Sequence, residues 1–359
     1  MSPSKFTSRS SAGPEALPTM ADVAKRAGVS AATVSFFLNN TKPLTPQTRG
    51  RIEQAIEELG FRRNVLARAL SSRRTRILAI ALPMNDRSVG GTVLDICVSA
   101  AAFARQHDYH LILWPVGNDG QELDELLAQN LVDGVLLLEV LVHDARVGVL
   151  RRRNIPFAMI GRTKDAKDLA YVDIDFDAAM AIALDHLQQL GHSKIGLLTG
   201  PSAGPGLNDY SPAVFIKQAY RQACTERQVT PDAGECDLTL AAGRDFASRL
   251  IAEGSDMTAL LVFNERAAMG VVAGLQVGGM RVPQEMSIVS LNTSDQMAGV
   301  ADPLLTTVRL PVHELAKRSL DMLIEQVEGR PVSRSILLPC TLHPSTTTAA
   351  ARQTNRQIG

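Results

Sequence analysis

The stretch GVSAATVSFFLNN, residues 28–40, places a glycine and a serine directly before a short run of helical periodicity. Val34, Phe37 and Leu38 fall on one face of the expected helix, and they suffice to dock it on neighbouring helices. The opposite face carries Phe36, where a polar side chain is expected if that face meets only water. The outward face is therefore the feature to explain: it packs on protein, or it meets something outside the protein.

The residues around this stretch carry start and stop signals for three helices. A residue that can cap a helix N-terminus precedes each of them, and the three are Thr19, Ser30 and Thr45. Gly28 and Gly60 are placed to end the first and the third helix. A three-residue turn containing glycine between two short helices is typical of a helix-turn-helix motif. A small helical bundle that binds no nucleic acid is the alternative.

The segment that follows is strongly basic. Residues 61–76 contain six arginines and no acidic residue. Their apolar pattern covers only two helical turns, which are marginal in water. We expect a hinge helix that folds only against DNA or against a second copy of the chain. A plain basic linker is the alternative.

Net charge differs between the two parts of the chain. Residues 1–76 carry 13 Lys and Arg against 5 acidic residues, whereas the remainder carries 24 against 32. Unless this asymmetry arose by chance, it indicates that the N-terminal part meets a polyanion.

Composition is that of an ordinary globular protein. Apolar residues make up 45% of the 359-residue chain and charged residues 21%, and no apolar run is long enough to cross a bilayer. The N-terminus lacks the apolar segment of a secretory signal, so we expect a cytoplasmic, nucleoid-associated protein with no membrane partner. The cysteines are scattered, which favours buried thiols in a reducing compartment over disulfides or a zinc site.

From residue 75 onward, short apolar strands alternate with amphipathic helices. Strands that are apolar throughout indicate parallel sheets covered on both faces. The order reads as about four strand-helix units followed by about four more, which predicts two lobes. A ligand cleft is expected at the carboxyl ends of their strands.

Catalytic motifs are missing from the sequence. No glycine-rich phosphate loop, catalytic-serine motif or zinc-protease motif occurs, and the seven histidines lack metal-ligand spacing. We interpret His192 as a residue that caps the end of a helix, with a catalytic role as the alternative. We interpret Asp173 as a solvated or capping residue at a strand-to-helix junction. We therefore expect no enzyme activity and no cofactor.

Five motifs carry a resemblance to a known family: MADVAKRAGVSAATVSFFLN (20–39), ELGFRRNVLARAL (58–70), LQQLGHSKIGLLTG (187–200), VFNERAAMG (262–270) and PLLTTVRLP (303–311). From about Thr19 to Pro344 the sequence resembles the LacI-type transcription regulators, the family of the lactose and purine repressors. The resemblance implies a homodimer. It also implies an N-terminal all-α helix-turn-helix domain with a hinge helix, and a two-lobed α/β core of parallel sheets like that of periplasmic binding proteins. Three crossovers would join the lobes, and the helix near 311–328 would return to the first lobe.

The domain boundaries expected from the resemblance are a disordered leader (1–18), a helix-turn-helix DNA-binding domain (19–62), a hinge helix or linker (63–74), the effector-binding and dimerisation core (75–348) and a flexible tail (349–359). Within the core, the first lobe is expected over about 75–172 and 306–329, and the second over about 173–305 and 330–348.

The resemblance also implies contacts with a double-stranded DNA operator. Ala31, Ala32 and Phe36 would face base edges in the major groove. The other residues implied to contact DNA are Ser30, Thr33, Ser35 and Asn39 at the second helix and Asn64, Ala67, Arg68 and Leu70 in the hinge. Leu70 corresponds to the leucine that enters the minor groove.

Two residues of the DNA-binding part depart from the family pattern. Phe36 stands where an Arg is usual, which removes a bidentate contact to guanine. We expect a weaker preference for guanine at the corresponding operator position and more contact with thymine methyl groups. Arg63 replaces the usual hinge proline.

The resemblance further implies a small-molecule effector between the lobes, a sugar or a related metabolite. The residues expected to contact it are Asp86, Arg162, Ile216, Leu238, Asn264 and Asn292. Asn264 matches the ligand-binding Asn of the family, whereas three others depart from its pattern. Ile216 falls at the Arg that usually grips the ligand, Leu238 at a stacking aromatic, and Asn292 at an Asp.

These departures change the expected ligand. An Arg-to-Ile exchange removes several hydrogen-bond donors from the pocket. The ligand is then more apolar than a sugar bound in the usual manner, or the pocket no longer holds an effector.

The expected function is a sequence-specific transcriptional regulator, in the first place a repressor, that binds a near-palindromic operator as a homodimer. Ligand-dependent closure of the lobes would control DNA binding. A solute-binding protein of the periplasmic type is the alternative, but it would need an export signal and has no use for residues 19–71. An enzyme on an α/β scaffold is the second alternative, which the missing motifs disfavour.

Overall fold

The computed structural model describes residues 18–39, 41–61, 74–83, 90–200, 209–293, 299–332 and 335–352. The chain divides into two compact units, Met1–Thr75 and Arg76–Gly359. Apart from Pro18 and Arg74, the expected leader and hinge lie outside the described residues.

The described part of the first unit consists of three helices, α1 (Met20–Ala27), α2 (Ala31–Asn39) and α3 (Pro46–Leu59). The hydroxyls of Thr19, Ser30 and Thr45 each accept a hydrogen bond from a backbone N–H of the helix that follows, at 3.3, 3.1 and 3.2 Å. Gly28 and Gly60 end α1 and α3 with φ of 64° and 58°, in the left-handed region that glycine adopts without strain. The sequence signals for helix starts and stops are thus confirmed.

A small hydrophobic core joins these helices. Its buried members are Val23, Ala24, Ala27, Val34, Ile52 and Ala55. Phe37 and Leu38 of α2 are partly buried and pack against this core. The face of α2 predicted to dock on the other helices therefore does so.

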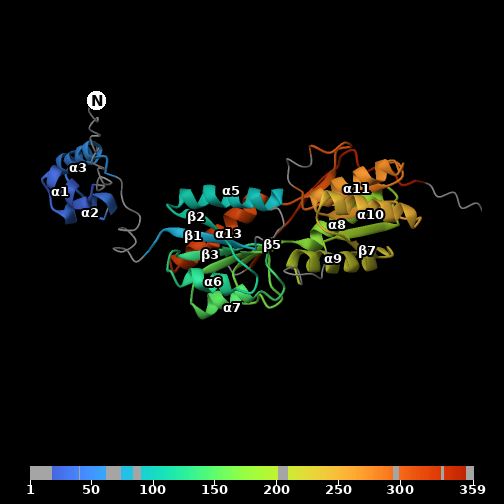
Figure 1. Ribbon diagram of the computed structural model, residues 1–359, viewed down its shortest axis with the longest axis horizontal. Coiled ribbons are helices and arrows are strands. Elements are labelled where there is room, and N and C mark those ends of the chain that lie inside the picture. The colour runs from blue at the N-terminus through green and yellow to red at the C-terminus, as the bar shows by residue number, and fades with distance from the viewer. Residues whose placement is uncertain are drawn as a thin grey trace, which may run out of the picture. The chain divides into compact units, whose positions relative to one another are not determined.

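The first lobe of the second unit is built on a six-stranded parallel sheet of order β11-β5-β4-β3-β1-β2. Its strands are β1 (Ile77–Leu82), β2 (His110–Pro115), β3 (Gly134–Leu137), β4 (Phe157–Ile160), β5 (Tyr171–Ile174) and β11 (Ser335–Leu338). Its helices are α5 (Gly91–Gln106), α6 (Gln121–Leu127), α7 (Ala145–Arg152) and α13 (Val312–Val327). Helices α5 and α13 cover one face of the sheet, and α6 and α7 cover the other (Figure 1).

The second lobe repeats this plan with a sheet of order β12-β10-β9-β8-β6-β7. Its strands are β6 (Ile195–Thr199), β7 (Asp232–Glu235), β8 (Ala259–Phe263), β9 (Ser287–Leu291), β10 (Thr306–Arg309) and β12 (Thr341–His343), of which β12 alone runs antiparallel to its neighbour. Its helices are α8 (Phe176–Gln189) and α9 (Ser211–Arg227) on one face and α10 (Leu240–Ala252) and α11 (Glu265–Val277) on the other.

The central strands are buried on both faces, which explains their apolar sequences. In β1, Leu78 and Ile80 pack toward α5 and α13, whereas Ala79 and Ala81 belong to the cluster under α6 and α7. Because successive strand residues point to opposite faces, both faces must be apolar. The predicted fold class, a helical N-terminal domain followed by a two-lobed α/β core with parallel sheets, is confirmed.

The chain passes between the lobes three times, after β5, after β10 and after β11. As the resemblance implied, α13 returns to the first lobe, where it packs on α5 and β4. Two expected boundaries are wrong. Thr306–Arg309 pairs with β9 and lies in the second lobe, and Ser335–Leu338 pairs with β5 and lies in the first. An apolar strand pattern indicates burial but not the sheet that the strand joins.

The tail expected to be flexible from residue 349 is held at its start. His192 is 3% exposed, and its Nε2 donates to the carbonyl of Ala349 at 3.0 Å. The Ala349 N–H donates to the Ser287 hydroxyl at 3.1 Å, and the Ala351 N–H donates to the Leu190 carbonyl at 2.8 Å. The His192 side chain therefore fastens the C-terminal segment to the second lobe, which replaces our interpretation of it as a helix cap.

Three further findings concern the described residues only. No described helix combines the length and apolar character needed to cross a membrane. The four cysteines are free and buried, as the sequence predicted. Within the same part of the chain, no three His, Cys, Asp or Glu residues lie where they could hold a metal ion.

Candidate functional site

The outward face of α2 is the first candidate site. Ala31 and Ala32 are exposed, while Phe36 is half-buried and lies outside the hydrophobic core of its unit. The Lys42 Nζ lies 4.6 Å from the centroid of the Phe36 ring. A cation over an aromatic face is attracted by the negative potential of the ring. A positive charge thus stands beside the residue that replaces the usual Arg.

The remaining residues predicted to contact DNA divide into two groups. The Ser30 and Thr33 hydroxyls share a hydrogen bond of 2.8 Å at the start of α2, and Ser35 is half-buried. Asn39 ends α2, but its side chain lies outside the described part of the structure, as do the hinge residues Asn64, Ala67, Arg68 and Leu70.

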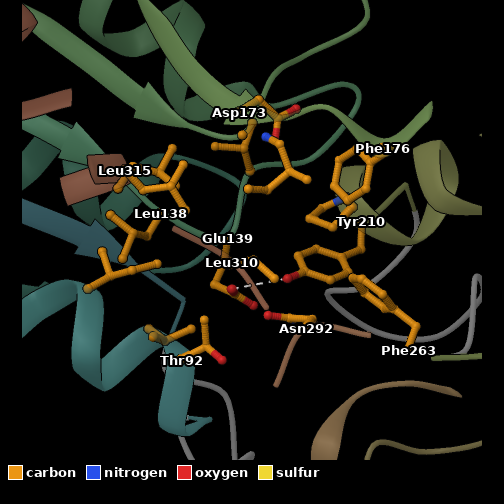
Figure 2. A pocket seen from close by; sticks show the side chains of 17 residues that line it. Thr92, Leu138, Glu139, Asp173, Phe176, Tyr210, Phe263, Asn292, Leu310 and Leu315 are labelled. Carbon is orange, nitrogen blue, oxygen red and sulfur yellow. Dashed lines mark hydrogen bonds between the residues drawn. The ribbon is translucent and has the colours of Figure 1, made fainter. Parts of the chain in front are cut away.

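The second candidate site is a pocket of about 640 Å³, solvent at its mouth included. It lies at the carboxyl ends of β3, β4 and β5 in the first lobe and of β8 and β9 in the second, where open α/β sheets bind ligands. Most of its wall is apolar, and the side chains that carry polar groups are Thr92, Glu139, Asp173, Tyr210 and Asn292. The structure therefore has a cavity at the position where the sequence predicted a ligand cleft (Figure 2).

The side chains of Glu139 and Tyr210 point toward each other in this pocket (Figure 2). The Tyr210 hydroxyl donates to Glu139 Oε1 at 3.1 Å, which links the two lobes. Burial raises the pKa of the Glu139 carboxyl, although the Tyr210 hydrogen bond and the Arg146 charge oppose the shift. Asn292 Oδ1 is buried beside them and has no hydrogen-bond partner among the described residues. The pocket thus holds one unpaired acceptor, whose desolvation a ligand donor would offset.

Asp173 is buried at 4% exposure, which corrects our interpretation of it as a solvated residue. Arg162 Nη1 donates to Asp173 Oδ2 at 2.9 Å, and the Arg162 guanidinium lies over the Phe215 ring, 4.1 Å from its centroid. Burial raises the pKa of Asp173 to about 6, because desolvation of the carboxylate outweighs the charge of Arg162 and the Ile174 N–H bond.

A fully buried arginine positions the first-lobe wall of the pocket. Arg146 makes a two-point ion pair with Asp144, with its Nε 2.9 Å from Oδ1 and its Nη2 2.7 Å from Oδ2. The guanidinium also donates to the carbonyls of Ala81, Leu138 and Glu139, at 3.4, 3.1 and 3.1 Å. Ala81 lies near the end of β1, and Leu138 and Glu139 directly follow β3. Arg146 therefore fixes the backbone that carries the Glu139 carboxyl.

Residues 139–143 and 209–211 form a seam between the lobes on one side of the pocket. The Val142 N–H donates to the Asp209 carbonyl at 2.7 Å, and the Ser211 N–H donates to the Val140 carbonyl at 3.1 Å. His143 and Asp209 add an exposed contact of 2.9 Å, which contributes little in water. The Glu139 and Tyr210 bond lies at the pocket end of this seam, where a ligand could act on both lobes.

Of the six residues predicted to contact an effector, one lines the pocket and a second lies behind its wall. Asn292 lines it, and its φ of 58° lies in the left-handed region that Asn tolerates. Arg162 lies one step behind the wall, where it pairs with Asp173.

Three of the other four are described and do not line the pocket. Ile216 is 2% exposed and belongs to the main hydrophobic core, because it lies on the buried face of α9. Leu238 packs at Gly200, and Asn264 caps α11, its Oδ1 accepting two backbone N–H bonds at 2.9 and 3.2 Å. Asp86 lies outside the described residues.

Sequence reasoning missed Glu139 and Tyr210. Glu139 directly follows the apolar strand GVLL, so the strand-end argument that selected Arg162 would also have selected it. Tyr210 precedes a helix rather than following a strand, and no sequence signal pairs it with Glu139.

We predict that Asp173 makes the protein less stable as the pH rises from 4 to 7. The folded-state pKa of about 6 lies above the ordinary value of 3.8, so protonation favours the folded state. This stabilisation is complete below pH 3.8 and is lost as the pH rises through 6. Because one pKa unit equals about 1.4 kcal/mol, the loss is at most about 3 kcal/mol.

Denaturant unfolding from pH 4 to 7 measures this loss, with Asp173→Asn compared against the natural chain. Asp177→Asn removes an exposed carboxylate nearby and serves as the matched control. The difference between the free energies of unfolding of the natural chain and of Asp173→Asn, followed against pH, should show the titration of Asp173. The same difference for Asp177→Asn should not. Parallel profiles for Asp173→Asn and the natural chain would show that the carboxyl titrates equally in the folded and unfolded states.

Comparisons with known proteins cover both units of the chain. The family model for bacterial regulatory proteins of the lacI family matches residues 19–64, and the model for the periplasmic binding protein-like domain matches residues 184–348. The chain is 25% identical over 339 residues to the HTH-type transcriptional repressor PurR of Vibrio atlanticus (strain LGP32), which covers 91% of this chain and 96% of that protein. It is 28% identical over 338 residues to the HTH-type transcriptional repressor CytR of Escherichia coli (strain K12), which covers 91% and 95%.

A solved structure extends this likeness to three dimensions. The lac repressor dimer bound to operator and the anti-inducer ONPF matches with a TM-score of 0.82 and 25% identity, covering 93% of this chain and 99% of that one. The two family models fall on the two units found here, the helix-turn-helix and the two-lobed core. The chain thus carries a DNA-binding domain of the lacI family and a periplasmic binding protein-like domain, and it is similar over most of its length to the repressors PurR and CytR.

Proposed function

We propose that this protein is a cytoplasmic transcriptional repressor that binds a near-palindromic operator as a homodimer. A small molecule bound in the pocket between the lobes controls its affinity for the operator. The observation that carries the proposal is the presence in one chain of a helix-turn-helix with an uncovered α2 face and a core with a cavity between its lobes. PurR and CytR, which the chain resembles over most of its length, are transcriptional repressors by name.

The geometry of α2 supports the DNA-binding part. Its inner face is used in packing, so Ala31, Ala32 and Phe36 remain for the major groove. The small Ala side chains allow close approach, and Phe36 offers an apolar contact to thymine methyl groups. In this proposal Lys42, which stands over the Phe36 ring, reaches a phosphate rather than a base.

A homodimer is supported by apolar side chains left uncovered on α5. Leu94 and Val98 are 57% and 62% exposed, and they lie one helical turn apart on the same face. Neighbouring apolar residues on an exposed helix face favour contact with another protein surface. We place a second copy of the chain on this face, because two DNA-binding heads need a twofold partner to read a near-palindrome.

Through the seam, a bound ligand can change the arrangement of the lobes and thereby DNA binding. A molecule that contacts Glu139 and Tyr210 touches both lobes, so its affinity depends on how the lobes sit. A ligand that binds one lobe arrangement more tightly shifts the population toward that arrangement.

Removal of residues 1–74 tests the DNA-binding proposal against the solute-binding alternative. The core has its own hydrophobic clusters, so the shortened protein should keep a cooperative unfolding transition. It should lose all binding to DNA fragments that the full-length protein retards in a gel. For the full-length protein, the logarithm of the affinity should fall linearly with the logarithm of the salt concentration. Retention of DNA binding by a folded core would overturn the proposal.

Selection of bound sites from random DNA tests the role of Phe36. With the natural chain, we expect no dominant guanine at the half-site position that residue 36 faces. The variant Phe36→Arg restores the bidentate donor and should raise the preference for guanine there by about 1–3 kcal/mol. Phe37→Arg is not a usable control because Phe37 packs on the core. Gln54→Arg adds the same charge at an exposed position of α3 and serves instead. A dominant guanine with the natural Phe36 would contradict this reading of the helix.

The double substitution Leu94→Glu with Val98→Glu tests the dimer. Carboxylates on this face should oppose association without affecting the fold, because both side chains are already exposed to solvent in the single chain. Sedimentation should show a dimer for the natural protein and a monomer for the variant. Val277→Glu, at a residue 85% exposed on α11, is the matched control and should remain dimeric. An unchanged mass for the double variant would place the interface elsewhere.

A further inference from the structure

The charges around the pocket are unbalanced. None of the described residues that line it is Lys, Arg or His, whereas two of them, Glu139 and Asp173, carry carboxyls. Arg162 lies behind the wall and is engaged by Asp173 at 2.9 Å. The Asp173 charge is therefore balanced inside the protein, and Glu139 needs separate consideration.

Glu139 has no cation at ion-pair distance within the described structure. The Arg146 guanidinium, whose charge acts on Glu139, directs its hydrogen bonds to Asp144 and to backbone carbonyls, among them the Glu139 carbonyl rather than its carboxyl. The Tyr210 hydroxyl donates a single hydrogen bond to Oε1 at 3.1 Å. A carboxylate can accept about four hydrogen bonds, so most of its accepting capacity remains open to the pocket.

A second acceptor lies beside the first. Asn292 Oδ1 is buried without a hydrogen-bond partner among the described residues, and the close-up shows it next to the Glu139 and Tyr210 pair (Figure 2). An orphaned buried acceptor costs free energy until a donor reaches it. A hydrogen-bond donor from a ligand would therefore be favourable at Asn292 Oδ1 and at the Glu139 carboxylate, and at Glu139 a positively charged donor is favoured.

The rest of the pocket wall indicates the chemical character of the ligand apart from its charged group. Phe176 and Phe263 present rings to the pocket, and Leu138, Leu310 and Leu315 present aliphatic groups. Such walls offer no hydrogen bonds to a ring of hydroxyl groups, and polar groups buried against them stay unsatisfied. The ligand body favoured here is a compact apolar or aromatic group.

We propose that the pocket binds a small primary amine with an apolar or aromatic body, whose ammonium group lies between the Glu139 carboxylate and Asn292 Oδ1. The proposal rests on the proposed function only in that it names the ligand class of the same pocket. The ammonium group has three donors and no acceptor, which matches two acceptors and leaves one donor for water. An anionic ligand would meet the uncompensated Glu139 charge in a site of low polarity.

Three probes with the same ring and a two-carbon chain separate charge from shape: 2-phenylethylamine, 2-phenylethanol and phenylacetate. Their affinities for the full-length chain are measured by calorimetry at neutral pH, without DNA. The amine should bind at least about tenfold more tightly than the alcohol, equal to about 1.4 kcal/mol. Phenylacetate should not bind at millimolar concentration. Because DNA is absent, this result does not depend on whether the protein is a repressor.

The variant Glu139→Gln locates the effect. Its amide oxygen can still accept from Tyr210, so the pocket keeps its shape while the charge is removed. Affinity for the amine should fall about tenfold or more, and affinity for the alcohol should not change. An unaltered thermal unfolding curve without probe shows that the variant is folded. If Glu139→Gln proves unfolded, Asn292→Asp provides the reverse test and should strengthen amine binding.

Three outcomes would overturn the proposal. One is binding of the alcohol or phenylacetate as tight as that of the amine. Another is equal amine affinity for the natural chain and a folded Glu139→Gln variant. The last is no binding by any of the three probes at about 10 mM, because even a small ligand that fits gains several kcal/mol.

Discussion

The buried ion pair between Arg146 and Asp144 is the interaction on which the functional part of the core depends. Both side chains are fully withdrawn from water, and the guanidinium ties together the ends of β1 and β3 through backbone carbonyls. Removal of one partner from such a pair leaves a buried charge uncompensated, which is strongly destabilising. The chain that leaves this junction carries Glu139 into the pocket and then forms the seam with the second lobe.

The same residues consequently line the pocket and form the contact between the lobes. The seam continues from the Glu139 and Tyr210 hydrogen bond to the backbone bonds of Val142 and Ser211. In the function proposed above, a ligand at Glu139 would alter the first of these bonds and thereby the relative stability of lobe arrangements. A coupling of this kind requires only that the ligand bind two arrangements with different affinities, and it requires no path through the rest of the protein.

Local signals explain how much of the fold the sequence could predict. Thr19, Ser30 and Thr45 cap their helices because a hydroxyl before a helix satisfies free N–H groups, and that chemistry depends on neighbouring residues only. The apolar strands likewise predicted parallel sheets. The sheet that each late strand joins depends on contacts distant in sequence, so 306–309 and 335–338 were assigned to the wrong lobes. The pocket was predicted in place but not in detail, because Ile216 faces the core and Tyr210 meets Glu139 only through tertiary packing.

The central claim is that the two units serve one task, the recognition of a symmetric DNA site. The measurement that tests it most directly is recovery of genomic DNA fragments by the purified full-length protein, followed by sequencing. We expect the recovered fragments to share a sequence with approximate twofold symmetry, as two identical heads of a dimer require. Fragments that share no common sequence, or share one without twofold symmetry, would contradict it.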